Sequence, residues 1–195
     1  MTAITPLEFV HKQGIFGDHQ KKNESDLLKI SEVKNLAIIQ IVQYKGSKIN
    51  INDIKIEGLE IPTQSSKVNT NKETRILWNA PRTWLILLSK ENAIETVQKN
   101  FKETDFAITD ISHSRAVIQI QGEQAKEILK KGSPINFNEF GVNQCAGTVF
   151  HGITIIINSI SNDPDTFYIL VLRSFGESFY HHITDSALEF GYVGV

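Results

Sequence analysis

Short apolar runs alternate with helical patterns between residues 83 and 151, and their order restricts the possible folds more than any other feature. Residues 83–88 (Thr-Trp-Leu-Ile-Leu-Leu) form an unbroken apolar run, which is typical of a strand buried on both faces. A helical pattern continues to residue 101, and strand, strand, helix and strand patterns follow. The order β-α-β-β-α-β is that of the split βαβ, or ferredoxin-like, unit. We therefore predict the α+β class.

Additional antiparallel strands and a C-terminal helix follow this core. Residues 153–160 are strongly β-branched, and a turn cluster at 161–165 separates them from a second strand over 166–173. The sequence from Ser174 to Glu177 has the S-x-x-E form of a capping box, which predicts a helix start. One face of that helix carries an apolar stripe, which predicts a buried face: Phe175, Phe179, Ile183, Ala187 and Phe190.

The first 71 residues are more polar than the rest and are predicted to form an extension. Residues 36–42 are a plausible strand, and 49–56 fit either another short strand pair or an irregular segment. We expect residues 1–71 to contribute one or two strands that pack on a core domain formed by residues 72–195. So polar a segment orders itself poorly, and part of it is expected to be mobile until a partner binds it.

Charge and cysteine content exclude several classes of function. A net charge of −2 gives no basic excess for nucleic acid, and the single cysteine, Cys145, excludes an internal disulfide and a Cys-based zinc site. The N-terminus lacks the basic and apolar regions of a secretory signal. The longest apolar stretch, residues 153–157, is too short to span a bilayer. We expect a cytoplasmic protein that binds neither nucleic acid nor membrane.

Common catalytic and phosphate-binding motifs are not found in the sequence. His113 lies between two serines, but neighbouring residues of a strand point to opposite faces. His181 and His182 diverge by about 100° on a helix, which leaves no shared metal without a third ligand. Cys145 fits a small buried residue of a strand. We therefore predict no catalytic residue, no metal site and no bound cofactor in this chain.

Arginine is rare, and its positions suggest fixed roles. Only four of the 20 basic residues are arginines, and each lies at the end of an apolar run or in a turn. The planar fork of arginine suits bidentate hydrogen bonding, although codon bias and chance are the alternative explanation. Two tryptophans flank one of these turns, where core packing is the alternative to an interface role. The candidate structural or partner-contact residues are Arg75, Trp78, Arg82, Trp84, Arg115 and Arg173.

Four segments resemble the gamma subunit of heterotetrameric sarcosine oxidase, in order and at compatible spacing over about residues 72 to 192. The family motifs are L-W-x-G-P-x-x-W-L, D-[VI]-S-x-x-R-A-V, G-x-x-A-x-x-[LI]-L and R-S-F. The corresponding segments are Arg75–Leu85, Thr109–Val117, Gly122–Leu129 and Arg173–Phe175. Ala80 stands where the family pattern favours glycine, so that turn is expected to differ in detail.

The resemblance implies a subunit that is not catalytic on its own. The family's holoenzyme oxidatively demethylates sarcosine to glycine, makes hydrogen peroxide, and passes the one-carbon unit to tetrahydrofolate or releases it as formaldehyde. Its partners are the alpha, beta and delta subunits, and FAD, FMN, NAD and tetrahydrofolate are implied in those partners. The gamma fold is related to the folate-binding module of aminomethyltransferases.

Two other functions remain open from the sequence. The first is a gamma-type subunit of a related N-methyl amino acid dehydrogenase, for example one acting on N-methylglutamate. The second is an independent folate-binding or aminomethyltransferase-like protein of the same fold. This second function requires a carboxylate that meets the pterin ring, and Asp110 is the strand-end carboxylate in a suitable place.

Overall fold

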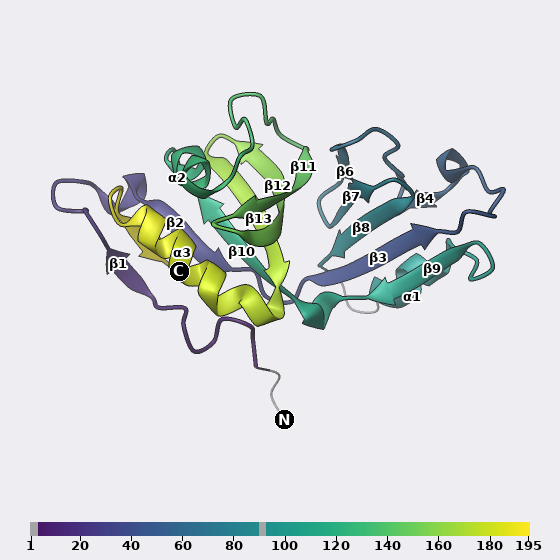
Figure 1. Ribbon diagram of the computed structural model, residues 1–195, viewed down its shortest axis with the longest axis horizontal. Coiled ribbons are helices and arrows are strands. Elements are labelled where there is room, and N and C mark those ends of the chain that lie inside the picture. Colours follow the sequence, from purple (N-terminus) through teal and green to yellow (C-terminus); the bar gives the residue numbers. More distant parts are fainter. Residues whose placement is uncertain (1–3, 90–92) are drawn as a thin grey trace. The chain divides into compact units, whose positions relative to one another are not determined.

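The chain forms two compact units in the computed structural model, which describes residues 4–89 and 93–195 (Figure 1). Unit 1 contains the chain up to Lys34 together with Ser114–Val142 and Gly147–Val195. Unit 2 contains Asn35–His113 and Asn143–Ala146. Each unit is therefore assembled from segments that are distant in the sequence. Within the described ranges, no helix has both the length and the apolar character needed to cross a bilayer.

Unit 1 is built on a seven-stranded sheet with the strand order β1-β14-β2-β10-β13-β12-β11. β14 runs parallel to β2, whereas β10 is antiparallel to both β2 and β13. The strands span Gly14–Phe16 (β1), Leu28–Glu32 (β2), Arg115–Gln121 (β10), Cys145–Phe150 (β11), Ile153–Asn162 (β12), Asp165–Leu172 (β13) and Tyr192–Gly194 (β14). The additional antiparallel strands expected after residue 151 are confirmed as β12 and β13.

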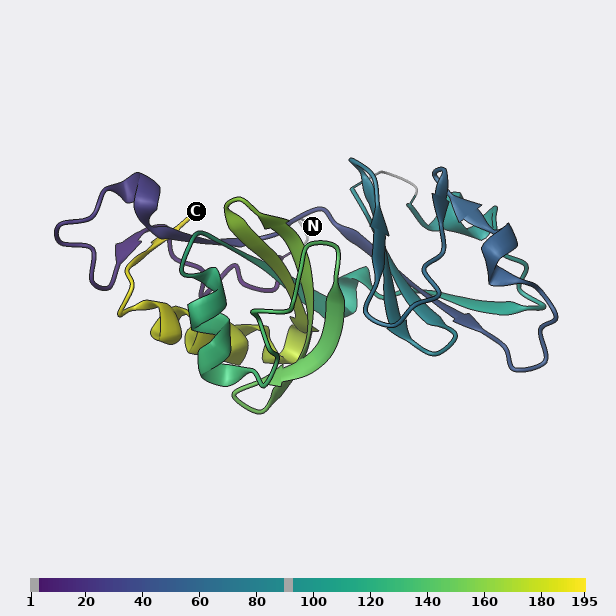
Figure 2. The same cartoon turned by 90° about the horizontal axis from the view of Figure 1, so that it is seen from above.

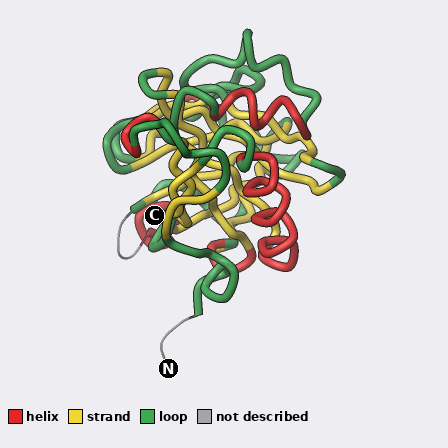
Figure 3. The backbone as a smooth tube through the Cα atoms, turned by 90° about the vertical axis from the view of Figure 1, so that its left-hand side faces the viewer, coloured by secondary structure: helices red, strands yellow, loops and turns green. Residues whose placement is uncertain are grey.

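Helices α2 (Ala125–Gly132) and α3 (Gly176–Ala187) pack against each other and against β13 (Figures 1 and 3). A Cβ atom placed on Gly176 would lie 3.3 Å from the Cβ of Ala116, so α3 covers the face of β10 that Ala116 shares with Ile118 and Ile120. Alternate strand residues fill the core on this face together with both helices. These buried side chains include Ile118, Ile120, Ile128, Leu129, Ile155, Ile157, Phe167, Ile169, Phe179 and Ile183.

The C-terminal helix is confirmed, but the predicted capping box is wrong. Residues Arg173–Phe175 form a 3₁₀ turn (η4), so α3 begins at Gly176 and its N-cap position is Phe175, with no side-chain cap. Because the tighter turn comes first, Ser174 does not stand where its hydroxyl could cap the helix. The centre of the predicted apolar stripe is buried, whereas Phe175 at its start is exposed.

The N-terminal segment is anchored along unit 1 rather than set apart from it. Glu32 accepts hydrogen bonds from the Thr5 hydroxyl (2.8 Å) and from the Leu7 amide (3.1 Å). The two nitrogens of the His11 ring lie 3.0 Å from Tyr180 Oη and 2.9 Å from the Val195 carbonyl oxygen. β1 then pairs with β14, so the first and last strands of the chain lie side by side (Figure 2).

Unit 2 is a five-stranded antiparallel sheet with the order β6-β7-β8-β3-β9. Helix α1 packs against one face of this sheet. Alternate residues of β3, β7, β8 and β9 form one core cluster with α1, which includes Ile39, Ile41, Ile76, Ile86 and Phe106. The strands span Ala37–Gln43 (β3), Lys55–Ile56 (β4), Leu59–Glu60 (β5), Val68–Thr70 (β6), Thr74–Ala80 (β7), Thr83–Leu88 (β8) and Phe106–Asp110 (β9). β4 and β5 pair separately as a two-stranded sheet.

Helix α1 spans Ala93–Gln98 and ends before the predicted end at Phe101. The expected start at Ser89 leads into residues 90–92, which lie outside the described residues. At the other end, Phe101 is buried in the core cluster although it lies beyond the helix. Short 3₁₀ turns occur at Glu24–Asp26 (η1), Ile51–Asp53 (η2) and Ser112–Ser114 (η3).

The α+β class is confirmed, and so is the element order β-α-β-β-α-β. These six elements nevertheless belong to two sheets: β8, α1 and β9 lie in unit 2, whereas β10, α2 and the sheet partners of β11 lie in unit 1. The chain passes from one unit to the other at η3. The pattern of apolar residues specifies the type of an element but not the strand with which it pairs.

The structure also corrects the domain boundary expected at residue 72. The first 71 residues supply β1 and β2 to unit 1 and β3 to β6 to unit 2, which is more than one or two strands. The boundary at residue 72 falls between β6 and β7, which pair with each other. The actual divisions follow Lys34 and His113, because strand pairing rather than local polarity decides which segments share a core.

Candidate functional site

Arg75 makes hydrogen bonds inside unit 2. Its side chain is half-buried on β7, where Nη1 donates to the Thr70 hydroxyl (3.3 Å) and Nη2 donates to Asn143 Oδ1 (3.0 Å). The guanidinium therefore joins β7 to the neighbouring strand β6 and to the distant segment 143–146. This arrangement uses the fork geometry of arginine within the unit.

The two tryptophans face each other across the β7–β8 hairpin. Trp84 is only 4% exposed and belongs to the core cluster, and its indole Nε1 donates to the Pro62 carbonyl at 2.8 Å. Trp78 is its cross-strand partner and packs against the same cluster while partly exposed. In this geometry Trp84 is a core residue with a satisfied polar atom, whereas Trp78 presents some ring surface to solvent.

Arg82 occupies the turn of the same hairpin in a left-handed conformation with φ of 59°. Its Nη1 donates to the Tyr44 carbonyl (3.1 Å), and its own carbonyl accepts from the Gln43 amide (2.9 Å). The strand register shifts between Trp78 and Ala80, so the hairpin contains a bulge. Ala80 itself does not have a positive φ, and the family's preference for glycine there is not required by this backbone.

The other two arginines lie in unit 1 near the end of β13. Arg173 in η4 is half-buried, and its Nη2 donates to the Ile4 carbonyl at 2.6 Å. Arg115 begins β10 and is in register with Leu172. Burial lowers the pKa of the Arg115 guanidinium, and no carboxylate in the described part of the chain forms an ion pair with it.

Arg173→Lys is expected to lower the free energy of unfolding by about 1 kcal/mol, the range for one charge-assisted hydrogen bond on a half-exposed group. Lysine keeps the charge but cannot reproduce the direction of the guanidinium donor toward Ile4. Urea denaturation midpoints measure the effect. Arg82→Lys is the matched control, because exposed Arg82 also binds one carbonyl, and its midpoint should change less. Equal midpoints for wild type and Arg173→Lys would contradict this role.

Cys145 is buried, and its thiol donates to the Trp78 carbonyl at 3.1 Å. Burial raises the pKa of the thiol to about 12. Since the thiolate is the reactive form, this environment gives an unreactive structural cysteine. Its burial in a strand confirms the prediction from the sequence.

Alkylation of Cys145 is expected to be very slow in the native protein. With a pKa of about 12, on the order of one thiol in ten thousand is ionised at pH 8. Iodoacetamide at pH 8 should therefore modify the native chain far more slowly than the chain in guanidinium chloride, as followed by mass spectrometry. Similar rates in the two conditions would show that the thiol is accessible and ionisable.

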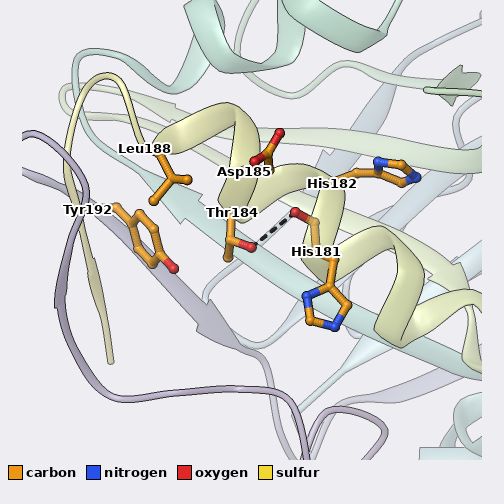
Figure 4. A pocket seen from close by; sticks show the side chains of 6 residues that line it. All are labelled: His181, His182, Thr184, Asp185, Leu188 and Tyr192. Atoms are coloured by element: carbon orange, nitrogen blue, oxygen red, sulfur yellow. Dashed lines mark hydrogen bonds between the residues drawn. The ribbon is translucent and has the colours of Figure 1, made fainter.

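A depression of about 390 Å³ lies at the C-terminal end of α3 beside β14 (Figure 4). Its lining residues are His181, His182, Thr184, Asp185, Leu188 and Tyr192. Figure 4 shows the two histidines pointing apart, and the Thr184 hydroxyl donates to the His181 carbonyl (3.1 Å) rather than to a site in the depression. Burial raises the pKa of Tyr192, so its phenol stays protonated. No sequence pattern singled out Tyr192.

Other candidate groups serve the local structure. Asp110 Oδ1 accepts from both the Ser112 amide (2.9 Å) and the Ser112 hydroxyl (2.5 Å), and that hydroxyl accepts from the Ile38 amide (2.9 Å). This carboxylate therefore shapes the turn after β9. Within residues 4–89 and 93–195, no three His, Cys, Asp or Glu side chains come close enough to hold a metal ion.

Comparisons with known proteins agree on one family. The family model described as "Sarcosine oxidase, gamma subunit family" matches residues 50–189. The "Sarcosine oxidase subunit gamma" of Corynebacterium sp. (strain U-96) is 28% identical over 120 residues, which are 60% of this chain and 58% of that protein. Its counterpart from Corynebacterium sp. (strain P-1) is 29% identical over 138 residues, 68% of this chain and 66% of that protein. The matched region thus spans less than two thirds of either relative.

Two solved structures share the fold. A chain of the heterotetrameric sarcosine oxidase from Corynebacterium sp. U-96, solved with pyrrole 2-carboxylate, has a TM-score of 0.81 at 22% identity and is matched over 97% of both chains. The glycine cleavage system aminomethyltransferase T from Bartonella henselae has a TM-score of 0.60 at 12% identity, over 80% of this chain and 45% of that one. The predicted relation to the aminomethyltransferase fold is thereby confirmed. Since the family model covers well over half of the sequence, this chain belongs to the sarcosine oxidase gamma subunit family.

Proposed function

We propose that this chain is the non-catalytic gamma subunit of a heterotetrameric sarcosine oxidase. In this role it supports oxidative demethylation of sarcosine to glycine, with transfer of the one-carbon unit to tetrahydrofolate. Its partners in the cytoplasm are the alpha, beta and delta subunits. FAD, FMN, NAD and tetrahydrofolate bind to those partners.

One observation carries the proposal: nearly the whole chain, 97% of it, follows the backbone of one chain of a heterotetrameric sarcosine oxidase. The agreement includes the N-terminal segment before residue 50, which lies outside the match to the family model. Over residues 50–189 the sequence itself matches the gamma subunit family, which supports the same role.

The contacts of the candidate residues support the same role. Arg75 and Trp84 hold unit 2 together, and Arg173 holds the N-terminal segment in unit 1. Asp110, the carboxylate required by the independent folate-protein alternative, is engaged by Ser112. We therefore propose structural roles for Arg75, Arg82 and Trp84, and we propose partner contact for Trp78, Arg115 and Arg173.

Co-expression tests the proposal directly. The chain expressed with the alpha, beta and delta subunits should elute with them as one complex that consumes oxygen when sarcosine is added, whereas the chain alone should show no sarcosine-dependent uptake. Omission of this chain is the control, and it should reduce the yield or activity of the complex. A chain that elutes alone, or that turns over sarcosine alone, would overturn the proposal.

The same preparation separates the alternatives. Oxidation of N-methylglutamate in place of sarcosine would favour the related dehydrogenase. A lone chain that binds tetrahydrofolate stoichiometrically would favour the independent folate protein.

A further inference from the structure

The sheet of unit 2 has two edge strands, β6 and β9, and the chain covers only one of them. At β6 the Val68 amide donates to the Asn143 carbonyl (2.9 Å), and the Cys145 amide donates to the Ser66 carbonyl (2.8 Å). At β9 no strand of the described residues pairs with the outer side. Because proteins normally protect the edges of their sheets, an edge left free while the opposite one is covered indicates a site for strand addition.

Two hydrogen bonds at the ends of β9 define which of its residues face the neighbouring strand β3. The Tyr44 amide donates to the Asp105 carbonyl (2.9 Å), and the Ile111 amide donates to the Ile38 carbonyl (2.9 Å). Hydrogen-bonded and non-hydrogen-bonded pairs alternate along an antiparallel ladder, and the register of β9 with β3 is unbroken. The odd-numbered residues of 105–111 therefore bond to β3, and the even-numbered residues direct their backbone groups outward.

The outward-facing residues are Phe106, Ile108 and Asp110. The Phe106 amide donates to the Lys102 carbonyl (3.0 Å) at the start of the strand. Within residues 4–89 and 93–195, the backbone amides and carbonyls of Ile108 and Asp110 make no hydrogen bond. Asp110 is exposed and Ile108 is partly exposed, so these two residues present two donors and two acceptors in line, as an incoming strand requires.

The side chains of β9 leave room for that strand. Ala107 and Thr109 are small and lie on one face of the sheet, whereas Ile108 packs against the core cluster on the other face. β9 also lacks the devices that commonly block an edge, because it contains neither a proline nor a bulge. An extended segment can therefore approach the edge along its length.

The charges around this edge are mainly negative and determine the chemistry of its occupant. Three carboxylates, those of Glu103, Asp105 and Asp110, lie in or next to β9, against the single ammonium group of Lys102. None of these four side chains forms an ion pair among the described residues. Two copies of the chain joined at β9 would bring like charges together, and the proposed heterotetramer contains the chain once. The edge therefore suits a basic segment of a different polypeptide.

We propose that the free edge of β9 binds one extended, basic segment of a partner subunit, which joins the sheet of unit 2 as a sixth strand and places a lysine or arginine beside Asp110. The inference rests on the function proposed above and adds the way in which unit 2 is held in the complex. Main-chain hydrogen bonds to Ile108 and Asp110 supply affinity, and the charge pair fixes the register.

Hydrogen exchange resolved to single amides tests whether the edge is filled. In the lone chain the amides of Ile108 and Asp110 should exchange fast, whereas those of Ala107 and Thr109, bonded to β3, should exchange slowly. In the complex co-expressed with the alpha, beta and delta subunits, exchange at Ile108 and Asp110 should slow at least tenfold. Ala107 and Thr109 are internal controls, because their bonds exist before assembly.

Two substitutions at Ile108 separate backbone pairing from simple coverage of the surface. Ile108→Pro removes the outward amide but no bond to β3, so the edge loses a donor while the sheet keeps its ladder. Ile108→Ala is the matched control, because it shortens the same side chain and keeps the amide. Each variant is co-expressed with the wild-type chain and a limiting amount of tagged partner subunits, and mass spectrometry gives their ratio in the purified complex. Relative to Ile108→Ala, Ile108→Pro should be depleted at least tenfold.

Each outcome has a separate meaning. If the chain does not co-elute with the partner subunits, the proposed function fails, and the docking site fails with it. If it co-elutes while Ile108 and Asp110 still exchange fast, or if the proline and alanine variants assemble equally well, the edge is not the docking site and the function stands. If the lone chain is a dimer in which both amides are already protected, a second copy fills the edge, which overturns the proposed occupant. Thermal midpoints show whether both variants fold, and exchange in the wild type decides if the proline variant does not.

Discussion

Trp84→Ala is expected to lower the free energy of unfolding by about 3–5 kcal/mol, the range for truncating a large buried aromatic side chain. Trp84 is the second residue of β8, is 4% exposed, and belongs to the cluster that joins the sheet of unit 2 to α1. Its removal leaves a cavity and deprives the Pro62 carbonyl of its donor. Far-UV circular dichroism during urea denaturation should show an earlier transition, which belongs to unit 2.

Two phenylalanine variants separate packing from hydrogen bonding. Trp84→Phe keeps most of the ring but removes the donor to Pro62, so we expect a loss of about 1–3 kcal/mol. Trp78→Phe removes an indole that is partly exposed, and its midpoint should change much less. If Trp78→Phe proves the more damaging of the two, Trp84 is not the anchor of this core.

The sequence was sufficient to predict elements whose signal is local. β8 was predicted with its observed bounds because its apolar run is unbroken, and the face of α3 was predicted because buried side chains recur at helical spacing. The predicted capping box failed at Ser174 because a 3₁₀ turn with the same residues competes with it. A local sequence pattern cannot distinguish a capping box from a 3₁₀ turn, since either arrangement provides hydrogen bonds at the start of a helix.

Contacts between segments that are distant in the sequence could not be predicted from the sequence. Arg75 binds Asn143, and His11 binds Tyr180, across 68 and 169 positions of sequence. The rarity of arginine indicated a fixed role for Arg75 but did not identify its partner. In the same way, the polar composition of residues 1–34 concealed β1 and β2, because these short strands are stabilised by β14 and β10 rather than by an apolar pattern of their own.

Gly17→Ala is expected to cost on the order of 2–4 kcal/mol, because it combines backbone strain with a collision. Gly17 has φ of 75°, and a Cβ there would lie 2.3 Å from the carbonyl oxygen of Leu188. The same Leu188 carbonyl accepts a hydrogen bond from the Asp18 amide at 2.7 Å, so a displacement that relieves the collision also breaks this bond. The N-terminal segment would separate from the end of α3, and the neighbouring pair β1–β14 would fray with it. Hydrogen exchange at the amides of β1 and β14 should accelerate before that of β10.

Gly152→Ala is the matched control for this effect within unit 1. Gly152 has φ of 83°, close to that of Gly17, but no atom lies within 4 Å of the position its Cβ would take. This variant therefore carries the conformational strain alone, about 1 kcal/mol. The difference between the two variants isolates the close approach of the N-terminal segment to Leu188. If both variants lose the same stability and β1 keeps its slow exchange, the segment does not lie against α3 in solution.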